Sequence, residues 1–263
     1  MHVPLNLRSG AVSARQTAAI LGLAIAAALL PWLTAVALPP LAQPQEYHDF
    51  ADQRLMLGVP HALNVLSNLP FLLVGVMGLR AFHRGRLSDT VSRAARVPWR
   101  VMFIGVALTA FGSTYYHLDP TDATLVWDRL PMALGFAGLV AGTLADRAPR
   151  FAGPALAALG ATGVGSVAYW AASANLSPYL VMQLGFVAVA LLVTALVRSP
   201  YTRSGWLYGA VVLYAAAIVS ERLDRAIDTA LGGFVSGHTL KHLFAAAGIY
   251  VLYRMLLQRR SSG

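Results

Sequence analysis

Long apolar runs alternate with short polar stretches along almost the whole chain. A helix that crosses a bilayer needs roughly 20 predominantly apolar residues. The pattern predicts eight such helices, near residues 16–38, 62–82, 99–116, 128–145, 151–173, 179–197, 205–221 and 238–256. These helices use up almost all of the chain. We therefore expect an all-α membrane protein with one polytopic domain, residues 1–263, and no extramembrane appendage.

The composition agrees with this interpretation. The chain is 57% hydrophobic and only 12% charged, whereas a soluble globular domain carries about 25% charged residues. The sequence therefore excludes an ordinary soluble domain.

The first predicted helix, 16–38, follows a short polar leader, 1–15, and contains Pro31, where we expect a kink or a break. Its end, Ala35-Val-Ala37, resembles a signal-peptide cleavage site. However, the apolar run is longer than the ~7–15 residues usual for the hydrophobic part of a signal peptide. We therefore favour a spanning helix over a cleaved signal.

Charged residues are distributed unevenly between the two sides of the predicted bundle. If the N-terminus is cytoplasmic, alternate crossing places 15 of the 20 basic residues on that side: Arg8, Arg15, Arg80, Arg84, Arg86, Arg93, Arg96, Arg100, Arg147, Arg150, Arg198, Arg203, Arg254, Arg259 and Arg260. Nine of the 11 acidic residues fall on the other side. This is the positive-inside pattern, and it predicts that both termini are cytoplasmic. The net charge of +9 then requires no nucleic-acid partner.

The second predicted helix begins with an unusually polar segment that contains Asn64, Ser67 and Asn68. Asn64 and Asn68 are four residues apart and so share one face of a helix. Such side chains commonly make hydrogen bonds between membrane helices. We expect them to support a site from behind without binding a ligand.

A second polar segment, 112–132, joins two apolar runs and contains Ser113, His117, Asp119, Asp122 and Asp128. Ionisable residues at a membrane boundary usually mark a functional site. We therefore expect the chemistry of the protein to centre on this segment.

His238 and His242 open the last predicted helix at i,i+4 spacing, which places both rings on one face. Such a pair is typical of a shared metal, but a packed or interfacial pair is the alternative. Alternate crossing brings His117 and Asp128 to the same outer level of the bundle. Since the chain has no cysteine, any zinc must be held by histidines and carboxylates.

Three histidines without a thiolate are typical of catalytic zinc, because the fourth position stays open to water. A neighbouring carboxylate, Asp128, would then act as the general base. The alternatives for Asp128 are a salt bridge or a helix N-cap. Ser113 would donate a hydrogen bond to a developing oxyanion, and its alternative is a hydrogen bond to a carbonyl of its own helix.

The sequence resembles the alkaline ceramidases, which belong to the CREST superfamily of membrane hydrolases. Four motifs carry this resemblance: Asn64-Val-Leu-Ser-Asn-Leu-Pro-Phe71, Gly112-Ser-Thr-Tyr-Tyr-His117, Asp128-Arg-Leu-Pro-Met132 and His238-Thr-Leu-Lys-His242. The resemblance implies a seven-helix core, 62–256, with one extra N-terminal helix, eight spans in all. It also implies zinc bound by His117, His238 and His242, with Ser113 and Asp128 as the catalytic pair.

The function that the resemblance implies is hydrolysis of the N-acyl amide bond of a membrane lipid such as ceramide, which gives a fatty acid and a long-chain amine. Calcium is not carried over, because Glu46, Asp49 and Asp52 do not match the family's acidic stretch residue by residue. Arg129 stands where family members have glutamate. The Arg-rich loops and the lack of organellar signals indicate a bacterial inner membrane, with the site toward the outer side.

Two other functions use the same histidines. One is a receptor-like or structural membrane protein with a non-catalytic metal site. The other is a haem protein with two histidine ligands, although haem takes its axial ligands from opposite ring faces, whereas His238 and His242 share one helix face.

Overall fold

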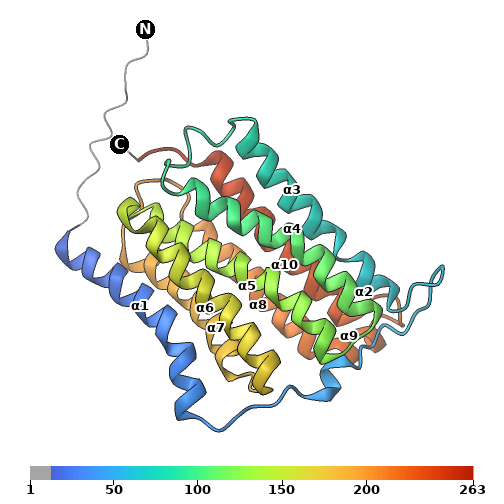
Figure 1. The fold of residues 1–263 in the computed structure, drawn as a ribbon. Coiled ribbons are helices and arrows are strands. Elements are labelled where there is room, and N and C mark those ends of the chain that lie inside the picture. Colours follow the sequence, from blue (N-terminus) through green and yellow to red (C-terminus); the bar gives the residue numbers. More distant parts are fainter. Residues whose placement is uncertain (1–12, 263) are drawn as a thin grey trace.

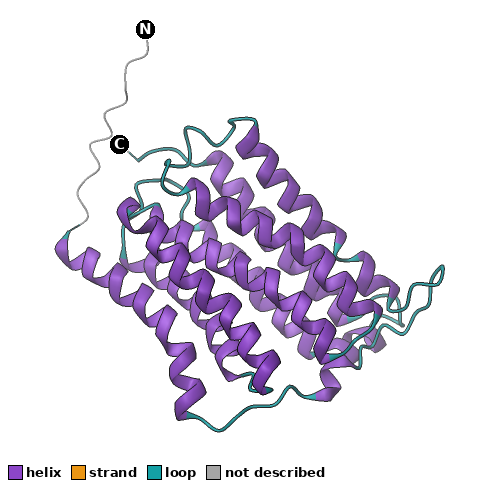
Figure 2. Ribbon diagram, in the orientation of Figure 1, coloured by secondary structure: helices purple, strands orange, loops and turns teal. Residues whose placement is uncertain are grey.

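The computed structural model describes residues 13–262, and in this range it contains helices and no β-strand (Figure 2). The helices are α1 (Ala14–Ala37), η1 (Gln45–His48), α2 (Ala62–Leu66), α3 (Leu69–His83), α4 (Arg96–Leu118), α5 (Asp122–Ala145), η2 (Pro149–Phe151), α6 (Ala152–Ser173), α7 (Ser177–Leu196), α8 (Trp206–Arg222), α9 (Asp224–Ala230) and α10 (Gly237–Gln258). Each of the eight predicted regions contains a helix.

Within residues 13–262, seven helical segments are long and apolar enough to cross a membrane, and α2 and α3 together form one of them. An eighth span is formed if α8, which has 17 residues, is counted with α9. These two helices meet at an angle of 83°. The predicted class, an all-α membrane protein with an N-terminal spanning helix, is confirmed.

The long helices run roughly antiparallel in one bundle (Figure 1). α4 packs along α5, α10 packs along α8, and α1 lies outside against α6 and α7. The start of α4, the end of α3 and the end of α10 lie at one end of the bundle, whereas α2 and α9 lie at the other (Figure 1). Neighbouring helices therefore bring residues that are distant in sequence to the same level.

The sequence predicts a kink or a break at Pro31. α1 continues through Pro31 and ends at Ala37, so the helix is not broken there. Its first turn carries a capping box between Ser13 and Gln16. Most of the predicted polar leader, including Arg8, lies outside the described residues.

α5 begins six residues earlier than the sequence pattern predicts. Thr121 is its N-cap and accepts a hydrogen bond from the backbone of Thr124, and Asp122 lies in the first turn. An acidic residue is favourable there because it faces the positive end of the helix dipole. The alternative that Asp128 caps this helix is therefore wrong, since Asp128 lies inside it.

A buried ion pair joins the end of α5 to the end of α10. Arg259 donates to both carboxylate oxygens of Asp146, at 2.5 and 2.9 Å, and to the carbonyl of Thr90 at 2.6 Å. Arg259 and Arg147 are only 3% and 5% exposed. Two of the basic residues counted for the membrane orientation thus also make buried hydrogen bonds inside the bundle.

Candidate metal centre

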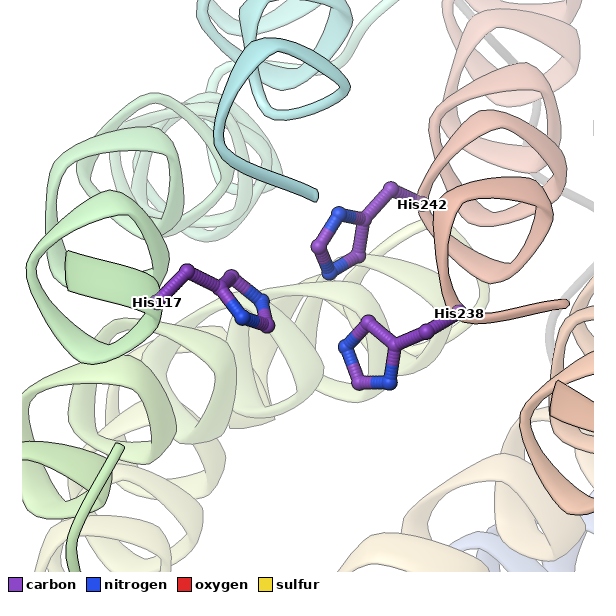
Figure 3. Close-up of side chains that lie close together, drawn as sticks. All are labelled: His117, His238 and His242. Carbon is purple, nitrogen blue, oxygen red and sulfur yellow. The ribbon is translucent and has the colours of Figure 1, made fainter. Parts of the chain in front are cut away.

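Three buried histidines meet at the end of the bundle opposite this ion pair. His117 lies in the last turn of α4, and His238 and His242 lie in the first two turns of α10. Their exposed fractions are 0, 3 and 3%, and one ring nitrogen from each lies within 4.8 Å of the other two. Figure 3 shows the rings converging from two sides. Among the described residues this group could hold a metal ion.

The geometry of the three rings fits metal coordination. Their centroids are 4.9 to 5.1 Å apart and no pair is stacked. Both ring nitrogens of His117, and Nε2 of His238, are buried without a hydrogen-bond partner within the described part of the chain. Buried polar atoms are normally paired. Unpaired nitrogens on His117 and His238, in a group where one nitrogen of each of the three rings lies within 4.8 Å of the others, therefore favour a cation that accepts nitrogen ligands.

Ser67 determines which nitrogen of His242 is free. Its hydroxyl oxygen lies 2.9 Å from the carbonyl oxygen of Asn64 and 2.7 Å from Nδ1 of His242. The single hydroxyl proton goes to the carbonyl, so Ser67 accepts the hydrogen bond from Nδ1–H. Nε2 of His242 then keeps its lone pair for a metal.

Asn64 connects α2 to the first turn of α10. Its side-chain oxygen accepts hydrogen bonds from Thr239 at 2.8 Å and from Ser236 at 3.2 Å. Asn68 donates to the carbonyl of Asn64 at 3.0 Å. The polar segment recognised in the sequence thus lies directly behind His242.

The start of α10 is fixed at the bend between α8 and α9. Asp224 accepts hydrogen bonds from the backbone of His238 at 2.7 Å and of Ala51 at 2.8 Å. A β-carbon on Gly237 would lie 2.1 Å from the carbonyl oxygen of Ser220. Only glycine permits this approach, which places His238 in the site.

The acidic residues before α2 have separate roles. Asp52 is fully buried and accepts hydrogen bonds from the backbones of Leu63 and Asn64, at 2.9 and 3.1 Å. It therefore caps the start of α2 from a distant loop. Glu46 and Asp49 are exposed, and Asp49 pairs with Arg225.

Phe50 covers the histidines. The sequence pattern did not identify it as part of the site. Its ring centroid lies 4.7 Å from that of His117 and 4.6 Å from that of His238, and the residue is 2% exposed. It belongs to the loop between η1 and α2. An apolar cover of this kind lowers the local dielectric around the rings.

Ser113 and Asp128 come together where α4 and α5 touch. A β-carbon on Gly112 would lie 2.0 Å from the carbonyl oxygen of Trp127, so the two backbones are in direct contact. Ser113 and Asp128 are 1% and 6% exposed. The Ser113 hydroxyl lies near the Asp128 carboxylate, although no hydrogen bond joins the two side chains in the described structure.

A second polar group that the sequence analysis missed lies beside His238. Lys241 and the hydroxyl of Tyr47 both donate to the same oxygen of Glu221, Tyr47 at 2.8 Å. This oxygen lies 4.0 Å from Nδ1 of His238. Burial, together with the Glu221 carboxylate, raises the pKa of Tyr47 to about 12. Tyr47 is therefore a neutral hydrogen-bond donor at physiological pH.

Neither family models nor curated proteins nor solved structures match this chain. The properties of the centre are thus argued from its own geometry.

We predict that replacing any one of His117, His238 and His242 by alanine removes most of the bound metal. Three protein ligands leave little redundancy, and they come from two different helices. Metal content of the purified protein, prepared without chelator, should be about one ion per chain. His83→Ala, an exposed histidine at the opposite end of the bundle, is the control. Full metal content in all three variants would contradict the assignment.

We also predict that Ser67→Ala lowers metal affinity by about 10- to 100-fold, because His242 loses the acceptor that fixes its tautomer. Competition with a chromogenic chelator measures this affinity. Ser166→Ala is the matched control, since Ser166 is also buried but bonds only to the carbonyl of Gly163 in α6. Equal affinities for the two variants would refute a role of Ser67 at the metal.

Proposed function

We propose that the protein is a zinc-dependent intramembrane hydrolase that cleaves the N-acyl amide bond of a membrane lipid. The observation that carries this proposal is the buried His117, His238 and His242 group with unpaired ring nitrogens. The resemblance of four sequence motifs to the alkaline ceramidases supports the same reaction. We take zinc as the metal because three histidines and no thiolate are typical of catalytic zinc.

The reaction adds water across the amide: the carbon–nitrogen bond breaks, the acyl carbon gains a hydroxyl group, and the nitrogen gains a proton. A bound zinc ion supplies Lewis acidity for such a step. In our proposal Asp128 takes the proton from the attacking water and delivers it to the leaving amine. Ser113, which lies beside Asp128, donates a hydrogen bond to the carbonyl oxygen as negative charge develops there.

The surroundings of the site favour a lipid substrate over a water-soluble one. A groove of about 420 Å³ opens on the outer surface between α4 and α5, lined by Leu108, Phe111, Gly112, Tyr115, Trp127, Leu130, Pro131 and Leu134. These walls are almost entirely apolar. Gly112 and Trp127 are the chain neighbours of Ser113 and Asp128. An acyl chain in this groove would therefore lie next to the proposed catalytic pair.

We predict that Asp128→Asn lowers the turnover of a long-chain N-acyl amine by about 100-fold or more while metal content stays unchanged. The substitution keeps the size of the side chain and removes its ability to accept the proton. Asp119→Asn, an exposed aspartate in the turn before α5, is the control. Release of fatty acid and bound metal are measured on the same preparation.

The outcome separates the two functions that share this centre. Fatty-acid release that is lost on chelation and restored by zinc supports the hydrolase. A stoichiometric metal without turnover of any N-acyl lipid would instead identify a receptor-like or structural metal site.

For the orientation we propose that the Arg-rich end faces the cytoplasm of a bacterial inner membrane, which places the histidine centre toward the outer side. The distribution of basic residues supports this. A reporter that is active only in the cytoplasm should therefore be active when it is fused to the C-terminus. Activity of a reporter that works only in the periplasm, fused at the same position, would show that the orientation is the opposite one.

A further inference from the structure

Arg129 is a buried cation next to the proposed catalytic Asp128. It is 5% exposed and lies in α5 between three aromatic rings. The central guanidinium carbon is 4.2 Å from the ring centroid of Trp170, 4.7 Å from that of Tyr179 and 5.7 Å from that of Tyr47. These rings hold the guanidinium by cation–π attraction and exclude water from it.

The hydrogen bonds of Arg129 are incomplete. Nη2 donates to the side-chain oxygen of Gln43 at 2.6 Å, whereas Nη1 is buried and has no hydrogen-bond partner in the described part of the chain. No carboxylate of the described residues lies within ion-pair distance of it. The charge is therefore enclosed without a counter-ion.

Two other buried cations of the bundle have a carboxylate partner. Arg259 binds both oxygens of Asp146, and Lys241 is paired with Glu221. A third, Arg147, also lacks one among the described residues and has an unpaired Nη2, but it donates to the backbone carbonyls of Val197 and Thr143 and is not enclosed by three aromatic rings.

A buried charge without a partner costs several kcal/mol. A planar guanidinium is suited to an anion with two oxygens, which it binds through parallel N–H donors. The free Nη1 of Arg129 thus indicates a ligand that brings such an anion.

We propose that Arg129 binds a carboxylate or phosphate group in the head group of the lipid substrate. This inference rests on the proposed hydrolase and specifies its substrate class: an N-acyl lipid whose amine portion carries an acid group. Arg129 directly follows Asp128 in α5. An anion held by Arg129 therefore keeps the amine portion beside the residue that would protonate the leaving nitrogen. Uncharged N-acyl amines lack this contact.

The test uses two amides with the same acyl chain, N-dodecanoylglycine, whose head group is anionic, and N-dodecanoylethanolamine, whose head group is neutral. Binding of each radiolabelled compound to the purified full-length protein is measured by equilibrium dialysis in a neutral detergent. We expect the wild type to bind the glycine compound about 10- to 100-fold more tightly, as one charge-assisted contact provides. Equal binding of the two compounds by the wild type would overturn the proposal without any variant.

Two substitutions then assign the preference to this side chain. Arg129→Gln should weaken binding of the glycine compound to the level of the neutral one and leave the neutral one unchanged. Arg129→Lys should retain part of the preference, because it keeps the charge but loses the fork. Arg222→Gln removes an exposed arginine and serves as the control for net charge. If Arg129→Gln weakened the binding of both compounds equally, Arg129 would have only a structural role.

Competitors identify the source of the anion. N-dodecanoylglycine should compete better than dodecanoate, because our proposal places the acid group on the amine portion and not on the acyl product. Competition by dodecanoate at the same concentration would assign Arg129 to the product carboxylate and overturn the head-group assignment. Competition by inorganic phosphate alone at the same concentration would show that Arg129 binds a free anion without the lipid, which also contradicts it.

Turnover of the same pair separates this inference from the proposed function. If the wild type prefers the anionic compound in binding but hydrolyses neither, the anion site holds and the hydrolase fails. If the wild type hydrolyses both compounds equally and binds them equally, the hydrolase holds and the anion site fails.

Discussion

Polar groups buried in an apolar bundle must find partners inside the protein, because no water or lipid head group reaches them. At the histidine end most of them do. Ser67 is bonded to His242, Asn64 to Thr239, and Asp224 to the backbone of His238. The few that remain unpaired include the facing ring nitrogens of the histidines and Nη1 of Arg129. Polar atoms of Asn64, Asn68 and Asp228 at this end also lack a hydrogen-bond partner in the described part of the chain. The histidine nitrogens differ from them because three rings converge on one point, and Arg129 differs because it carries a full charge without an ion-pair partner among these residues.

The two ends of the bundle meet this constraint in different ways. At the Arg-rich end, Arg259 and Asp146 neutralise each other, and Arg259 also donates to the carbonyl of Thr90. At the histidine end, cations and carboxylates lie close together but are not all matched. Lys241 is paired with Glu221, whereas Arg129 is not paired. Among the described residues, unpaired buried polar atoms also remain at the Arg-rich end, on Thr90, Trp99 and Arg147. The three converging histidines, and not unpaired atoms alone, therefore direct the search for function to the other end.

Much of the fold was predictable, because each spanning helix is a local apolar run. The positions of His117, His238 and His242 at one level followed from i,i+4 spacing and alternate crossing. The start of α5 was not predictable, because Asp122 and its polar neighbours have the composition of a loop. Only the structure shows that Thr121 caps the helix there. Phe50, Tyr47 and Asp224 could not be found from the pattern either. Their contacts join a loop to helices that follow much later in the chain, and only the tertiary fold sets such pairs.

The same loop links metal binding to the stability of this end. Phe50 packs on His117 and His238, Asp52 caps α2, and Ala51 is bonded to Asp224. The loop thus touches both α4 and the start of α10, the two helices that carry the histidines. A metal held by both helices would stabilise the folded state by an amount that grows with the ratio of its concentration to its dissociation constant. Phe50 covers the histidines through direct ring contacts, so the loop is held by its own contacts, and a bound metal would add to the stability of an end that these contacts have already closed.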